Sequence, residues 1–315
     1  MATGKTVRCG IAIPQDFIDA SLDVHLLQTY LARAETLGYE SAWVQEQIVG
    51  AVPILEPVTL LTYAAALTRT LRLGTSVMLT VLRNPVQLAK SLTSLDQLSQ
   101  GRVTVGVGLG GQTAEYPAFG ISPERRVRRF VEGLAIMNAL WTQPAVNFAG
   151  EFWRLDGISQ EPKPVQQPHP PLWFGARQPA ALRRAVRLGD GFMGAGSSST
   201  QDFQSQVQLL RGFLEEAKRD PATFTISKRV YIAVDPDKAR AEQRLRHWFG
   251  IRYRNADMAS QVAVWGSAGE CLEQLAAIVT YGAEHLLLNA AFDYMEHLEI
   301  FAKEIVPHLA GASRP

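Results

Sequence analysis

Short segments rich in β-branched residues alternate with longer segments of helical periodicity along the whole chain. Residues 7–13 have the composition of a strand, and Ser21 is suited to cap the helix that follows them. In that helix Leu22, Leu26 and Tyr30 share one face. A chain in which strands and helices alternate in this way builds a parallel sheet covered by helices. The alternation therefore assigns the chain to the α/β class.

The alternation continues through eight strands, which is the number that closes a (β/α)₈ barrel. We therefore predict one TIM-barrel domain over residues 1–315, and an open doubly wound sheet is the competing arrangement. The predicted strands cover residues 7–13, 41–44, 71–78, 103–107, 172–174, 191–194, 229–234 and 286–288. The predicted helices cover residues 22–37, 57–68, 85–98, 123–141, 179–188, 200–218, 268–281 and 294–309.

Two segments depart from this rhythm. Residues 146–171 are rich in proline and indicate an irregular excursion over the surface. Residues 237–264 are longer than one crossover requires, so we predict an insertion between the seventh and eighth strands. A capping box that joins Ser267 to Glu270 predicts the start of the helix after this insertion.

The charge balance excludes several classes of partner. Lys and Arg together number 31 and Asp and Glu 30, so a net charge of +1 offers no long-range attraction for nucleic acid or an anionic membrane. No apolar run approaches the roughly 18 residues that cross a bilayer, and residues 1–8 are too polar for a signal peptide. We therefore expect a cytoplasmic protein. The six histidines lack metal-ligand spacing, so we expect no metal.

Residues 106–111 read GVGLGG and match the dinucleotide-binding pattern GxGxxG. That pattern opens a helix in the first βα unit, whereas here it follows the fourth strand and leads into a long loop. We therefore reject a Rossmann site. A strand end without side chains, which lets a flat ring approach Gly108 and Gly110, is the better interpretation. The alternative is a tight turn with no ligand.

Small residues also follow the fifth and sixth strands, each time just before a helix. They are Gly175 and Ala176 in the first loop and Ser197, Ser198 and Ser199 in the second. Free amides ahead of a helix bind anions, because the amides converge and the helix dipole favours negative charge. We therefore predict a phosphate site here. The serines can also act as helix caps, and the two roles are compatible.

Glu46 and Gln47 follow the second strand at its C-terminal end. Catalytic residues of a TIM barrel gather at that end of the strands. Glutamates at strand ends are commonly just solvated, so the position makes Glu46 a candidate without assigning its role.

Several of these segments together resemble the bacterial luciferase-like monooxygenase family, which includes oxidoreductases dependent on coenzyme F420. The resemblance covers nearly the whole chain, and its segments occur in the family's order. They are residues 42–46 (AWVQE), 73–77 (LGTSV), 101–108 (GRVTVGVG), 118–121 (AFGI), Arg125 seven residues before Glu132, 168–175 (PHPPLWFG) and 184–191 (RAVRLGDG).

The resemblance implies a flavin-like ring that lies against the third strand, where a bulge with a cis peptide bond joins Ser76 to Val77. It implies that Glu46 and Gln47 line the ring pocket, and they are the candidate catalytic residues. The positions that correspond to cofactor-binding positions are Ser76, Val77, Gly108, Gly110, Gly175, Ala176, Ser197, Ser198 and Ser199.

Two departures from the family's sugar-phosphate dehydrogenases concern the chemistry. Those enzymes have a histidine at the position of Gln47 and a glutamate at the position of Gly111. Without that base and acid, alcohol oxidation by their route is not expected.

The 73–77 segment favours coenzyme F420 over FMN as the cofactor. We therefore predict an F420-dependent oxidoreductase, a homodimer, that transfers a hydride between the cofactor and a small organic substrate. The alternatives are an FMN-dependent monooxygenase, a non-catalytic flavin-binding relative, and a barrel hydrolase or lyase without a redox cofactor.

Overall fold

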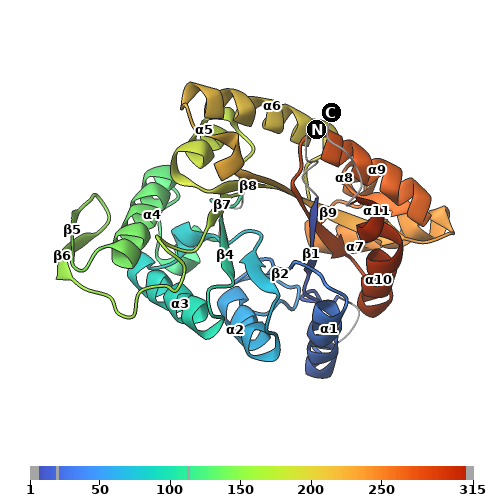
Figure 1. Ribbon diagram of the computed structural model, residues 1–315, viewed down its shortest axis with the longest axis horizontal. Coiled ribbons are helices and arrows are strands. Elements are labelled where there is room, and N and C mark those ends of the chain that lie inside the picture. The colour runs from blue at the N-terminus through green and yellow to red at the C-terminus, as the bar shows by residue number, and fades with distance from the viewer. Residues whose placement is uncertain (1–6, 19–20, 112–113, 310–315) are drawn as a thin grey trace.

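A computed structural model describes residues 7–18, 21–111 and 114–309, and within them eight parallel strands close into a ring (Figure 1). Closure follows from the pairing of the first and last of these strands and of β8 with β9. The predicted barrel is therefore confirmed. Its strands are β1 (Arg8–Ala12), β2 (Ser41–Val44), β3 (Arg72–Thr75), β4 (Val103–Val107), β7 (Leu172–Phe174), β8 (Gly191–Gly194), β9 (Thr225–Val234) and β11 (His285–Ala290).

Helices form the outer layer around the ring of strands (Figure 1). They are α1 (Val24–Thr36), α2 (Pro57–Leu67), α3 (Pro85–Leu98), α4 (Arg126–Thr142), α5 (Pro179–Leu188), α6 (Thr200–Glu216), α9 (Ala268–Tyr281), α10 (Tyr294–Ile300) and α11 (Val306–Leu309), the last two joined by a π-helical turn.

Two predicted helix starts were wrong. Asp23, and not Ser21, caps α1, because its side chain accepts hydrogen bonds from the amides of His25 and Leu26. Helix α4 begins at Arg126 rather than Pro123, because the backbone of Arg125 adopts the left-handed conformation and interrupts the helical path. The capping box from Ser267 to Glu270 is confirmed.

Two tryptophans fill the barrel interior beneath its mouth. The rings of Trp43 and Trp173 stack with their centroids 5.2 Å apart. Strand glycines provide the room: a Cβ on Gly74 would lie 2.3 Å from the Trp43 ring, and one on Gly191 would lie 2.7 Å from that of Trp173. Because this layer blocks the barrel axis, a ligand can enter only above it.

Both irregular segments of the sequence contain regular structure. Residues 146–171, expected to be irregular, include a hairpin of β5 (Val146–Ala149) and β6 (Arg154–Ile158), which projects at one edge in Figure 1. The predicted insertion is confirmed and consists of α7 (Lys238–Tyr253), α8 (Met258–Val262) and β10 (Val264–Gly266). Strand β10 extends the sheet by pairing with residues 232–234 at the C-terminal end of β9.

The predicted bulge after β3 is confirmed. Gly74 pairs with Thr104, whereas Met78 pairs with Val107, so four steps along this strand match three along β4. The extra residue lies in the stretch that contains Ser76, and the Ser76–Val77 peptide bond is cis as predicted.

No helix in the described part of the chain is long and apolar enough to span a membrane. The same residues contain no cluster of His, Cys, Asp and Glu suited to a metal ion. Residues 1–6, on which the signal-peptide expectation depends, lie outside the described residues.

Candidate functional site

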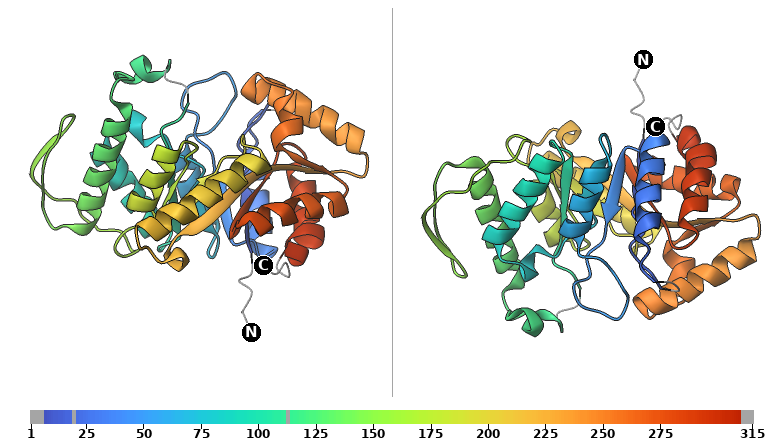
Figure 2. Two further views of the ribbon diagram at one scale, coloured as in Figure 1. Left: turned by 90° about the horizontal axis from the view of Figure 1, so that it is seen from above. Right: turned by 90° about the horizontal axis from the view of Figure 1, so that it is seen from below.

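A pocket of ≈ 770 Å³ opens at the C-terminal ends of the barrel strands. The loops after β2, β3, β4, β7 and β8 line it, together with the end of α7. In both views of Figure 2 the loop after β2 and the long helix α7 lie at the same end of the molecule. The insertion therefore contributes one wall of the site.

Some of the predicted site residues line this pocket and others do not. Those that line it are Glu46, Gln47, Ser76, Val77, Gly110 and Gly175. Those that lie outside its lining are Gly108, Ala176, Ser197, Ser198 and Ser199. Apart from Gly175, the predicted residues that line the pocket were expected at the ring. Apart from Gly108, those outside its lining were expected at the phosphate.

Glu46 is enclosed instead of facing the mouth of the barrel. Its side chain has 0% exposure and accepts hydrogen bonds from the Arg83 guanidinium and from the Leu79 amide. Arg83 also binds Glu56 at 2.8 Å. Burial raises the pKa of Glu46, and the Arg83 charge opposes that rise. The carboxylate thus joins the loops after β2 and β3 and positions the pocket wall.

Gln47 is held by an arginine from the insertion. The Nη1 of Arg252 donates a hydrogen bond to the Gln47 side-chain oxygen. The Nε of Arg252 lies 3.4 Å from the Asp16 carboxylate, and both side chains are largely buried. Burial raises the pKa of Asp16, an effect that Arg252 and Arg229 counteract. This contact fixes α7 across the pocket from β2.

The glycines that end β4 and β7 accommodate the bulge. A Cβ on Gly108 would lie 2.7 Å from a methyl of Val77, and one on Gly175 would lie 3.0 Å from the same methyl. The space that we assigned to a ring beside Gly108 is therefore taken by Val77. Gly110 has a φ of +68°, which explains a glycine at that position by its backbone conformation.

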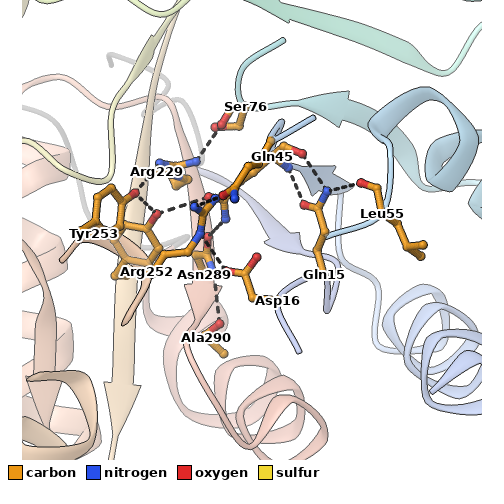
Figure 3. A network of polar contacts seen from close by, with 12 residues as sticks. Gln15, Asp16, Gln45, Leu55, Ser76, Arg229, Arg252, Tyr253, Asn289 and Ala290 are labelled. Atoms are coloured by element: carbon orange, nitrogen blue, oxygen red, sulfur yellow. Dashed lines mark hydrogen bonds and ion pairs between the residues drawn. The ribbon is translucent and has the colours of Figure 1, made fainter. Parts of the chain in front are cut away.

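Arg229 is the centre of a polar network in the pocket wall (Figure 3). Its Nη1 donates to the Ser76 carbonyl at 2.7 Å, and its Nη2 lies 3.5 Å from the Tyr253 hydroxyl. The hydroxyls of Tyr253 and Tyr231 are 2.5 Å apart. Burial alone would lower the pKa of Arg229, but both tyrosines and Asp16 raise it, so the guanidinium stays charged.

Sequence reasoning missed Arg229, Arg252 and Tyr253. Arg229 lies on β9, where we recognised a strand but assigned no function. The other two lie in the insertion, whose side chains carry no recognisable motif. The alternation of β9 was the only available signal, because it puts Arg229 and Tyr231 on one face of the strand.

The two loops of the predicted phosphate site lie side by side. The Nη2 of Arg177 donates to the Ser197 hydroxyl at 2.6 Å, which joins the loop after β7 to the loop after β8. Among the described residues no acceptor binds the amides of Ala176, Gly196 or Ser197. These amides are available to an anion.

Three predicted donors are not free, so that part of the prediction was wrong. The Gly175 amide donates to Val107, and the Ser198 amide donates to Ala195 at 3.1 Å. The Ser199 amide and hydroxyl both bind Asp202 in a capping box. Helix capping therefore explains Ser199, because α6 needs partners for its first amides.

A buried lysine lies beneath the loop after β8. The ammonium of Lys228 donates to the carbonyls of Ala195 (2.5 Å) and Ser198 (2.7 Å). Burial and the neighbouring Arg229 and Arg177 lower the pKa of Lys228 to about 7. Because the Ala195 carbonyl turns toward Lys228, the amide of the same peptide unit, that of Gly196, turns away from it. The lysine thus orients one of the free amides.

Comparison with known proteins gives a consistent result. A model of the family described as luciferase-like monooxygenase matches residues 10–285. An F420-dependent glucose-6-phosphate dehydrogenase of Beutenbergia cavernae is 29% identical over 320 residues, covering 91% of this chain and 94% of its own length. An FMNH₂-dependent dimethylsulfone monooxygenase of Pseudomonas putida is 26% identical over 259 residues, covering 71% and 70%.

The fold recurs in solved structures of similar size. An F420-dependent secondary alcohol dehydrogenase, solved with an F420–acetone adduct, superposes with a TM-score of 0.83 over 96% of this chain and 99% of that one. The two sequences are 22% identical, so this likeness concerns the fold.

Proposed function

Because the chain belongs to the luciferase-like monooxygenase family, we propose that it is an oxidoreductase that holds coenzyme F420 in the pocket above β3. The observation that carries the proposal is the combination of the bulge after β3 with a pocket whose wall contains Val77 and Met193. Apolar side chains beside the backbone polar groups of a bulge suit a flat heteroaromatic ring.

The chain also offers groups that can bind the phosphate of such a cofactor. The free amides of Ala176, Gly196 and Ser197, together with the Arg177 guanidinium, suit a phosphate, and Lys228 supports the loop that carries two of these amides. Glu46 and Gln47 would hold the ring end, Glu46 by fixing the wall and Gln47 by presenting its amide. The bound cofactor supplies the two-electron chemistry, and the chain supplies binding and orientation.

Coenzyme F420 and FMN share the ring and phosphate features, and relatives of both kinds exist. We favour F420 with hydride transfer to or from a small organic substrate, on the basis of residues 73–77. FMN with oxygen activation is the second candidate.

Equilibrium titration of the purified protein with F420 and with FMN, followed by fluorescence, tests this preference. We expect a lower Kd for F420. The opposite ranking would assign the protein to the FMN-dependent members, and binding of neither would refute the proposal. If F420 binds but no acceptor oxidises its reduced form, the protein is a non-catalytic relative.

Ser197→Asp tests the phosphate position. We expect about tenfold weaker cofactor binding or more, because a carboxylate would repel the phosphate and engage Arg177 instead. Ser198 is less suitable, since it is 4% exposed and an aspartate there would be buried. Ser205→Asp on the exposed face of α6 adds the same charge as a control. Equal affinities of the two variants would remove the phosphate from these loops.

A further inference from the structure

Arg229 is a buried cation that no carboxylate contacts directly in the described part of the chain; the nearby Asp16, which favours its charged form, is in contact with Arg252. Arg229 is 8% exposed, and no described carboxylate lies within ion-pair distance of its guanidinium. Its Nε finds no hydrogen-bond acceptor. The other two arginines of this region have partners: Arg252 has Asp16, and Arg83 has Glu46 and Glu56.

A charge at this depth without a counter-ion in contact is costly to the folded state. Taking a guanidinium out of water is unfavourable unless an anion and hydrogen bonds compensate for the lost hydration. The direct partners of Arg229 are a carbonyl and a hydroxyl, and the one nearby carboxylate, Asp16, is shared with Arg252, so two buried guanidiniums have one negative charge between them. Such a residue lining a pocket wall points to a ligand that brings the missing negative charge.

Three neighbours surround the guanidinium and set its orientation. The Ser76 carbonyl binds one end, the Tyr253 hydroxyl lies beside the other, and the Tyr231 ring lies 5.2 Å from the guanidinium carbon. A planar guanidinium fixed in this way presents a fork of donors that matches planar anions. Tyr253 and Gln47 line the same pocket and can add hydrogen bonds to the same group.

We propose that Arg229 is the receptor for a planar, delocalised anion inside the pocket, and that the enzyme therefore selects ligands that carry one. A substrate carboxylate and the anionic edge of a reduced ring share this chemistry. The inference rests on the proposed function only in assigning a ligand to the same pocket. A carboxylate can bind Arg229 whether or not a cofactor is present.

Benzoate and benzamide form a matched pair of probes, because they share a shape and differ in charge. We expect the cofactor-free protein to bind benzoate at least about tenfold more tightly than benzamide, measured by calorimetry at constant ionic strength. Arg229→Met should abolish the preference. Arg187→Met, on the exposed face of α5, removes the same charge elsewhere and should retain it.

Equal affinity of the wild type for the two probes would overturn the proposal, and so would an unchanged preference in folded Arg229→Met. Circular dichroism establishes the folding of the variant. Should it not fold, Tyr253→Phe decides, because loss of the hydroxyl beside Arg229 should lower the preference at least about threefold. An unchanged preference in that variant would also overturn the proposal.

A second arm distinguishes the two sources of the anion. If a substrate carboxylate is the partner, benzoate binds equally well to the protein saturated with cofactor. If the ring edge is the partner, saturating cofactor excludes benzoate, and Arg229→Met weakens binding of the reduced cofactor more than that of the oxidised form. Failure of cofactor binding alone would refute the proposed function and leave the benzoate preference intact.

Discussion

Gly106→Ala is expected to destabilise the protein by at least about 3 kcal/mol. A Cβ at this position of β4 would lie 1.8 Å from the carbonyl oxygen of Thr75. The obstacle is backbone, so no side-chain rotation relieves it. Thr75 is also tied to this residue, because its hydroxyl donates to the Gly106 carbonyl at 2.8 Å. The added methyl must therefore push β3 away from β4.

Urea unfolding of the wild type and the variant measures this effect. The matched control is Gly212→Ala, because Gly212 lies on the exposed face of α6 with no heavy atom within 4 Å of the added Cβ. There alanine should stabilise the protein by roughly 0.5–1 kcal/mol through its helix propensity. Equal unfolding free energies for the two variants would show that β3 yields easily at the bulge.

Arg102→Met is expected to cost about 3 kcal/mol of unfolding free energy, although Arg102 lies far from the pocket. Its guanidinium donates to the Ala65 and Thr68 carbonyls at the C-terminal end of α2 and to the Leu71 carbonyl that precedes β3. The Ser99 carbonyl binds its Nε at 2.7 Å. One side chain thus satisfies the end of α2 and the turn after α3.

Chemical denaturation again provides the measurement, with Arg102→Lys as the conservative variant and Arg69→Met as the control. Lysine keeps the charge but cannot reach all these acceptors from one point, so we expect an intermediate loss. Arg69 is exposed, and its removal should change stability by no more than about 0.5 kcal/mol. Cofactor affinity of the folded Arg102→Met protein should be unchanged. Arg102 precedes β4 and lies at the N-terminal ends of the barrel strands, where residues contribute to stability and not to the site. A stability loss as small as that of Arg69→Met would contradict the assignment.

The sequence was sufficient for the barrel because its signals are local. Strand and helix periodicities, the capping box at Ser267 and the helix-starting prolines at Pro57 and Pro85 depend on neighbours within a few residues. The same reasoning misplaced the start of α1, because Ser21 and Asp23 are both good caps, and in the structure it is Asp23 that binds the first amides of the helix.

The partners of the site residues were beyond such reasoning. The carboxylate of Glu46 was predicted at the barrel mouth, but only the loop after β3 brings Arg83 and the Leu79 amide around it. Gln47 likewise meets Arg252, 205 residues away in sequence, because the insertion folds back over the pocket.

Strand β9 shows most clearly what the sequence determined and what the tertiary structure decided. The sequence alone determined that Arg229 and Tyr231 of the predicted strand point to the same side, because side chains alternate along a strand. The structure extends this strand to Thr225, which adds Lys228 on the opposite side. Closure of the barrel then decided that Arg229 faces the pocket while Lys228 lies beneath the loop after β8. The hydrogen bonds and charges around each residue come from segments distant in sequence, so the tertiary structure set their chemistry.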